Sequence, residues 1–205
     1  MNRVIFIVED IVSSSGESTG ENSLVGRVTS QLIEMAGDSI EEPIHVLMDT
    51  DGGNMKTALS LFDLFKASPA PIYTYGLSEI CSAGVLIFIA GEKRYAMPHS
   101  QFMMHPSTLN VSGSTVDFKS TSETLKKQGK IVKDLFVEST KMSSKKFEEL
   151  HSRTNYMWAA EAKQVGIITD IIDKLPSDLL KPQAKTNVAE AAVHLQGLAE
   201  IIGKL

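Results

Sequence analysis

Two side chains that together can do nucleophilic chemistry lie 23 positions apart in the middle of the chain, Ser82 and His105. Ser82 is followed by the small residues Ala83 and Gly84 and by the apolar run Val85–Ala90, which predicts a tight turn leading into a buried helix. The first amides of such a helix have no partners within it, so they can stabilise an oxyanion beside the serine. Because a histidine can accept the serine proton, the pair indicates attack on a carbonyl.

Cys81 and Ser78 are the other nucleophilic side chains close to Ser82 in the sequence. Cys81 is offset by one residue, so its side chain should point elsewhere, and a lone cysteine is usually a small core residue. Ser78 falls within Gly76–Cys81, which we interpret as a turn after a short strand at Ile72–Tyr75. A serine in this position can also be only a helix cap, so the chemistry of Ser82 is one of two interpretations.

His105 is the histidine best placed to act as a base, because it follows the β-type segment Phe102–Met104 and can project beyond a sheet. His99 follows a proline in a predicted turn, so we expect it to be exposed. His45 lies inside an apolar run that predicts a buried strand, and we expect it to be a hydrogen-bonded core residue. A core role is also the alternative interpretation of His105.

The elements that would position the pair alternate between strand and helix. The predicted strands are the apolar runs Val4–Val8, Ile44–Met48 and Ile72–Tyr75. Apolar residues recur at helical spacing over Ser23–Ala36 and again in the set Ala58, Leu61, Phe62 and Phe65. Alternating strands and helices predict a parallel sheet with right-handed crossovers.

A Gly-Gly pair, Gly52-Gly53, follows Asp51 between the second strand and the next helix. Glycine permits backbone dihedrals that are closed to other residues, and it lets a ligand come close to the main chain. The alternative is an ordinary turn between a strand and a helix, because the spacing of a phosphate-binding loop is absent.

After His105 the pattern changes to helices. Thr115–Ser139 predicts a helix of about 40 Å at about 1.5 Å per residue, longer than a core of this size needs, so we expect it to project and to contact another subunit. Shorter helices at Ser144–His151 and Ala159–Val165 and a strand at Ile167–Ile172 follow. We therefore predict one domain over residues 1–175, then a linker and an amphipathic helix over residues 176–205.

Composition excludes several classes of protein. The 205 residues carry a net charge of −5 and no basic surface, which argues against nucleic-acid binding. The single cysteine excludes a disulfide framework within the chain and the usual multi-cysteine metal sites, and we expect no metal and no cofactor. No apolar stretch is long enough for a signal peptide or a membrane span, so we expect a cytoplasmic protein without membrane contacts.

Taken together, these features resemble the proteolytic subunit of the Clp protease, ClpP. The resemblance extends from about Arg3 to about Leu175, with the motifs in the family's order. The motifs are Val4-Ile5-Phe6, Asp51-Gly52-Gly53, Ser82-Ala83-Gly84, Ile89-Ala90-Gly91, Pro98-His99-Ser100, Met104-His105-Pro106, Tyr156-Met157, Ala160-Glu161-Ala162 and Gly166-Ile167. This ordering is more specific than any single motif.

The resemblance implies an α/β fold of stacked ββα units, shared with the crotonases, with a protruding handle helix. It implies a serine endopeptidase in which Ser82 is the nucleophile, His105 is the base, and Gly52 or Gly53 forms the oxyanion hole with the amide of Ala83. Such an enzyme cleaves peptides or unfolded proteins through an acyl-enzyme, without metal or cofactor, as a homo-oligomer.

The chain also departs from the family's pattern. The third catalytic residue of the family is an Asp directly before the segment that matches Asn155-Tyr156-Met157, and this chain has Thr154 there. Thr154 or Asn155 can accept a hydrogen bond from an imidazole but cannot stabilise its positive charge. The family's N-terminal segment, which engages an ATP-driven unfoldase, has little counterpart before the first strand, and the tail after Pro176 is longer than the family's. The unfoldase partner is therefore left open.

Two functions of different classes follow. Ser82, His105 and the Gly-Gly pair favour a peptidase, weakened by the missing carboxylate, whereas Thr154 favours a catalytically impaired structural or regulatory subunit. A third alternative is a relative of the acyl-CoA hydratases and isomerases, which share the fold and a backbone oxyanion hole but do not need a serine at position 82.

Overall fold

The computed structural model describes residues 3–12, 20, 23–107, 115–177 and 179. Arg3–Lys174 form one compact unit, and Met1–Asn2 with Leu175–Leu205 form a second. The predicted C-terminal helix and most of the predicted loop Ile11–Asn22 lie outside the described residues.

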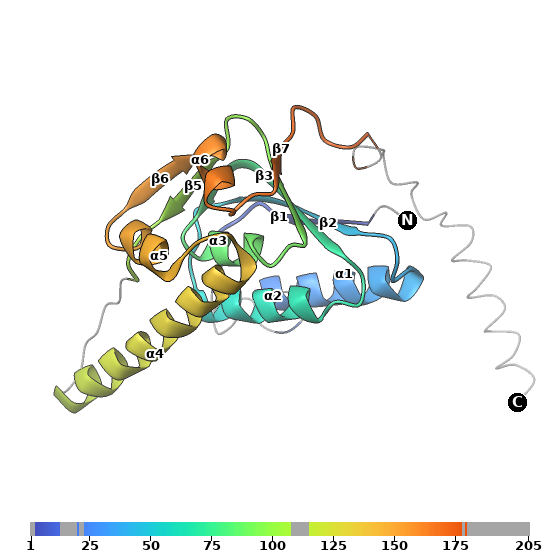
Figure 1. The fold of residues 1–205 in the computed structure, drawn as a ribbon. Coiled ribbons are helices and arrows are strands. Elements are labelled where there is room, and N and C mark those ends of the chain that lie inside the picture. Colours follow the sequence, from blue (N-terminus) through green and yellow to red (C-terminus); the bar gives the residue numbers. More distant parts are fainter. Residues whose placement is uncertain (1–2, 13–19, 21–22, 108–114, 178, 180–205) are drawn as a thin grey trace, which may run out of the picture. The chain divides into compact units, whose positions relative to one another are not determined.

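A seven-stranded sheet forms the centre of the first unit (Figure 1). Its main path runs in the order β1-β2-β3-β4-β7, while β5 pairs with β3, and β6 pairs with β5. The strands are β1 (Val4–Ile7), β2 (Ile44–Thr50), β3 (Ile72–Cys81), β4 (Lys93–Ala96), β5 (Gln101–Met104), β6 (Asn155–Trp158) and β7 (Asp170–Ile171). All pairs are parallel except β5 with β6. The predicted α/β class and parallel sheet are confirmed.

The helices connect the strands and cover the sheet. They are α1 (Leu24–Asp38), α2 (Met55–Ala67), α3 (Ala83–Phe88), α4 (Thr115–Ser139), α5 (Ser144–Leu150) and α6 (Ala159–Gln164). Figure 1 shows α1 and α2 side by side along one face of the sheet, and α3 packs against α2 and β3. Ser23 and Asn54 cap α1 and α2 by accepting the amide protons of Gly26 and Thr57, each at 3.0 Å, which fixes where these helices begin.

The core explains why α3 is short and wholly apolar. All six of its residues are buried, and Phe88 packs edge-on against Phe102 of β5 with ring centroids 5.1 Å apart. Burial of side chains of this size contributes roughly 1.5–3 kcal/mol each. The helix that follows Ser82 is therefore one of the most firmly held elements of the unit.

The predicted turn after Tyr75 is wrong, because β3 continues to Cys81. The strand changes neighbours along its length: its first half pairs with β4, and Glu79–Cys81 pair with β5. Ser78 and Glu79 are exposed, and the amide of Glu79 donates to Asp49 Oδ1 at 3.0 Å. Ser78 and Glu79, whose polarity suggested a turn, are thus solvent-exposed residues of a continuous strand.

The long helix α4 has the predicted bounds and extends from the rest of the unit (Figure 1). Its C-terminal half is anchored by the buried Val132 and Phe136, and Phe136 contacts Phe147 of α5 with ring centroids 5.2 Å apart. Phe118 and Ile131 are 64% and 51% exposed, which is high for such large apolar side chains. Among the described residues, no helix combines the length and the apolar character needed to cross a lipid bilayer.

Candidate active site

Ser82 occupies the junction between β3 and α3 in a conformation that is costly for a residue with a side chain. Its φ of 54° and ψ of −120° make it the one non-glycine residue with positive φ among the described residues. Such a conformation costs of order 1–3 kcal/mol and persists only where the surroundings enforce it. The hydroxyl makes no capping hydrogen bond to α3, so the helix-cap interpretation does not account for this serine.

The pairing of β3 with β5 brings His105 to this serine. The backbone amide of Ser82 donates to Met103 O at 2.7 Å, which extends the β3–β5 ladder by one step. His105 follows Met104, the last residue of β5, and its Nε2 lies 2.7 Å from Ser82 Oγ. This distance joins a nucleophile and a base within normal hydrogen-bond reach.

Gly52 and Gly53 form the opposite wall, and both have positive φ, 94° and 138°. A Cβ on Gly52 would lie 2.8 Å from Ser82 Cβ, so only glycine fits there. Ile11 holds the loop in place: its amide donates to Gly52 O at 2.8 Å, and its carbonyl accepts from Asn54 N at 2.6 Å. The glycine pair is therefore fixed directly against the serine.

The structure distinguishes the two glycines as oxyanion donors. The amide of Gly52 donates to Thr50 Oγ1 at 3.1 Å, so it is already used. Within the described parts of the chain, the amides of Gly53 and Ala83 have no acceptor. Gly53 and Ala83 are thus the pair of amides able to stabilise an oxyanion, while Gly52 provides the space for it.

A cavity of about 610 Å³ opens beside the pair. Ser82, His105 and Gly53 line it, together with His151 and Gln128. Its apolar wall is formed by side chains from α2, α3, β5 and α4, namely Met55, Leu86, Met104, Leu125, Val132 and Phe136. The cavity can accept an apolar side chain next to the serine.

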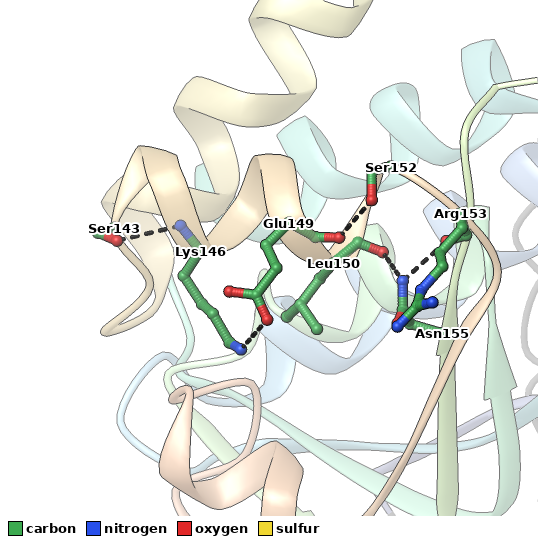
Figure 2. A network of polar contacts seen from close by, with 7 residues as sticks. All are labelled: Ser143, Lys146, Glu149, Leu150, Ser152, Arg153 and Asn155. Atoms are coloured by element: carbon green, nitrogen blue, oxygen red, sulfur yellow. Dashed lines mark hydrogen bonds and ion pairs between the residues drawn. The ribbon is translucent and has the colours of Figure 1, made fainter.

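Neither candidate for the third catalytic position hydrogen-bonds His105. Thr154 is exposed, and no hydrogen bond from its side chain is found among the described residues. Asn155 pairs with Met104 at the end of β5, but its Nδ2 donates to Leu150 O at 2.6 Å and to Arg153 O at 2.9 Å (Figure 2). Within the described parts of the chain, no carboxylate hydrogen-bonds His105.

His151 is a site residue that the sequence reasoning missed. It ends α5, lines the cavity with His105, and stacks on Phe147 with ring centroids 4.9 Å apart and planes 17° apart. Burial, and then the neighbouring His105, lower the pKa of His151 below its ordinary value. In the sequence, the one feature that could have indicated a role in the site is its place at the end of a predicted helix, three residues before Thr154.

The rival nucleophiles lie outside this arrangement. Burial of the Cys81 thiol, with Glu79 and Asp51 nearby, raises its pKa to about 11, so it is protonated at neutral pH and a poor nucleophile. Ser78 lines a separate acidic cavity with Asp49 and Glu79. Asp51, Glu79 and Cys81 place potential metal-ligand atoms within 4.8 Å of one another, but a protonated thiol is a weak ligand.

His45 and His99, the two other histidines among the described residues, also lie outside the cavity lining. His99 is exposed, as predicted. His45 is half-buried, and its Nδ1 lies 2.8 Å from the hydroxyl of Tyr75, which confirms the predicted hydrogen bond.

Comparison with known proteins gives this geometry a family. The sequence profile of the Clp protease family matches residues 3–175. The chain belongs to the Clp protease family. The profile spans the whole compact unit, including Ser82, His105 and the segment around Thr154.

Curated relatives of the Clp protease family carry the name ATP-dependent Clp protease proteolytic subunit 2. The protein from Treponema pallidum is 26% identical over 162 residues, covering 78% of this chain and 80% of the relative. The one from Corynebacterium diphtheriae is 24% identical over 161 residues, covering 78% and 81%. The one from Treponema denticola is 27% identical over 147 residues, covering 71% and 74%.

A solved structure of a ClpP1 mutant from Listeria monocytogenes has the same fold. The TM-score is 0.73 at 22% identity, and the match covers 88% of this chain and 95% of that one. The expected ClpP-like fold is therefore confirmed, and membership of the Clp protease family supports a peptidase.

Proposed function

We propose that this chain is a serine endopeptidase that cleaves peptides or unfolded proteins through an acyl group on Ser82. The observation that carries the proposal is the 2.7 Å contact between Ser82 Oγ and His105 Nε2. It involves a serine in a strained conformation whose hydroxyl does not cap the helix that follows it. A merely structural serine would not need this conformation.

The chemistry follows from the positions of these groups. His105 Nε2 takes the proton of Ser82 as Oγ attacks the carbonyl carbon, and the amides of Gly53 and Ala83 hold the resulting oxyanion. The protonated His105 then gives its proton to the leaving amine as the C–N bond breaks. Water, activated by His105, hydrolyses the ester on Ser82 and restores the free enzyme.

The apolar wall of the cavity supports a preference for peptides with an apolar side chain next to the cleaved bond. Leu86 and Met104 come from the two elements that hold Ser82 and His105, and Val132 and Phe136 close the cavity from α4. A charged side chain of the substrate would lose its hydration in this cavity. The described lining has no carboxylate to pair with a basic side chain, and Lys56 is its one lysine or arginine available to an acidic side chain.

Turnover should be slow. Replacing the carboxylate of a Ser-His-Asp site by a neutral group costs roughly 10⁴ in turnover, whereas the oxyanion hole and binding alone retain about 10³–10⁴ over water. We expect weak but measurable cleavage.

We further propose a homo-oligomer in which α4 contacts another subunit. The exposed Phe118 and Ile131 support this, because large apolar groups in a projecting helix are normally covered. Light scattering that gives a monomer at all salt concentrations would contradict the oligomer.

The relatives are named proteolytic subunits of an ATP-dependent protease, which supports an ATP-driven partner for this chain as well. The cytoplasmic location stays a prediction from the sequence.

A catalytically impaired structural or regulatory subunit is the second candidate. It is favoured by one observation: Thr154, at the family's carboxylate position, is exposed and does not hydrogen-bond His105.

Cleavage of a fluorogenic peptide separates the two functions. We expect slow cleavage by the natural chain, none by Ser82→Ala, and unchanged cleavage by the matched control Ser78→Ala. Equal background rates for all three chains would favour the non-hydrolytic subunit.

A further inference from the structure

We propose that His151 is a positioning residue for His105, its neutral imidazole accepting a hydrogen bond and so taking over part of the role of the missing carboxylate. The inference rests on the proposed peptidase function. It adds a residue that neither the Ser-His pair nor the family's carboxylate position would identify.

Among the described residues, no group is found to orient His105 by a hydrogen bond from the side away from Ser82. Ser82 Oγ lies at Nε2 of His105, so the orienting group must bind the other ring nitrogen, Nδ1. Thr154 is exposed, and Nδ2 of Asn155 donates to the carbonyls of Leu150, at the end of α5, and of Arg153 (Figure 2), so that neither residue is seen to hydrogen-bond His105. The position is therefore open to another acceptor.

His151 lies on the same cavity as His105 and is held there. Its backbone amide donates to Phe147 O at 2.8 Å, and its ring stacks on the Phe147 ring. Phe147 packs in turn on the buried Phe136 of α4, which also lines the cavity. The stacking on Phe147, itself held by Phe136, thus fixes the plane of the imidazole on the cavity that His105 also lines.

The charges around the cavity leave the ring of His151 without an acidic partner among the described residues. The titratable groups that line the cavity among the described residues are His105, His151 and Lys56, without a carboxylate. The acids of α5 are engaged elsewhere: Glu148 pairs with Lys133 at 3.0 Å, and Glu149 pairs with Lys146 at 2.8 Å. With burial and His105 both lowering the pKa of His151, its ring is neutral at pH 7 and keeps a lone pair for accepting a hydrogen bond.

The consequence is a requirement for two unprotonated imidazoles. Protonation of His105 removes the base, and protonation of His151 removes the acceptor and adds a positive charge that opposes the imidazolium formed during acylation. As the pH falls, log(kcat/KM) should approach a slope of about two, because both protons must be absent. A base oriented by a group that does not titrate gives a slope of about one.

The test is the pH profile of kcat/KM for a fluorogenic peptide in the natural chain and three variants. His151→Phe keeps the stacked ring but has no acceptor, and we expect at least a tenfold loss at about pH 8 and a slope of about one. His151→Gln keeps an acceptor that does not titrate, so it should retain more activity than His151→Phe, also with a slope of about one. His151→Asp introduces a carboxylate and should exceed both.

His99→Gln is the matched control, because it removes an exposed imidazole outside the cavity lining and should leave rate and slope unchanged. Labelling of Ser82 by a fluorophosphonate probe in the natural chain separates this inference from the proposed function. If Ser82 is labelled but the natural profile has a slope of about one, or if the Gln and Phe variants are equal in rate, His151 has no positioning role. If Ser82 is not labelled, the proposed function itself fails.

Discussion

The two halves of the candidate site are built differently. The nucleophile half, where Ser82 meets the Gly-Gly loop, is held by a buried helix, a strand ladder and the contacts of Ile11. The orienting half, where α5 passes into β6, consists of a half-buried His151 and an exposed Thr154. The family's pattern is kept in the first half and altered in the second. The core thus constrains the position of Ser82, whereas Thr154 is exposed and held by few contacts.

Gly52→Ala should break the arrangement in which Ser82 meets the Gly-Gly loop. Its Cβ would clash with Ser82, and its φ of 94° disfavours a side chain. Because the added methyl group would displace Ser82 and fill the space left for the oxyanion, we expect kcat to fall by roughly 10²–10³, the size of effect that follows loss of oxyanion stabilisation, and stability to fall by about 1–3 kcal/mol. Peptide turnover and urea unfolding measure the two effects.

Gly129→Ala is the matched control for that change. Gly129 lies within α4, and a Cβ there would meet no atom within 4 Å. Alanine should stabilise the helix by roughly 0.5–1 kcal/mol and leave turnover unchanged. Equal losses in the two variants would show that Gly52 has no special relation to Ser82.

Thr154→Asp should restore a carboxylate to the orienting half of the site. Thr154 precedes Asn155, which pairs with Met104, so it lies one step along the β5–β6 pair at the level of His105. We expect peptide turnover to rise at least roughly tenfold, a cautious fraction of the loss for removing such a carboxylate. A carboxylate also favours the imidazolium, so the acid limb of the profile should move to higher pH.

Thr154→Asn is the control for Thr154→Asp, because it adds a side chain of similar size without charge. A Thr154→Asp variant with the turnover and the pH profile of the Asn variant would contradict this account of the orienting half.

His151 should also make stability depend on pH. Its pKa is lower in the folded chain than the ordinary 6.5, so between these two values the unfolded chain binds more protons. Stability therefore falls as the pH drops through this window, and it is regained at higher pH. The melting temperature of the natural chain should fall more between about pH 7.5 and about pH 5 than that of His151→Phe. Parallel melting curves would show that the ring is not held in its neutral form.

The smallest effect is expected at Cys81, next to the nucleophile. Cys81 is 4% exposed, and burial raises the pKa of its thiol to about 11, so iodoacetamide should modify it slowly at neutral pH and leave peptide turnover unchanged. Mass spectrometry of the alkylated chain measures the extent of modification. Rapid alkylation with loss of activity would make the thiol a rival nucleophile.

The sequence predicted the elements with strong periodicity and missed those set by distant contacts. The bounds of α4 follow from its own helical spacing. β4, with the charged residues Lys93 and Arg94, has no apolar pattern and forms because β3 and β7 flank it. The predicted strand Ile167–Ile172 shortens to Asp170–Ile171, since the pairing partner offered by β4 is short.

The same distinction holds for the site. The order of motifs was enough to predict that Ser82 and His105 meet. Sequence could not separate Gly52 from Gly53 as the amide donor, because the choice depends on a hydrogen bond from Gly52 to Thr50. Nor could it place His151, whose orientation depends on stacking against Phe147.

Reaction of the chain with a fluorophosphonate probe, followed by mapping of the modified residue, shows whether Ser82 is the acylated nucleophile. We expect the label on Ser82 and expect Ser82→Ala to abolish it. The variant should keep the melting temperature of the natural chain to within a few degrees, since the hydroxyl caps no helix. A label on Ser78 or Cys81, or labelling that persists in Ser82→Ala, would contradict the assignment of Ser82 as the nucleophile.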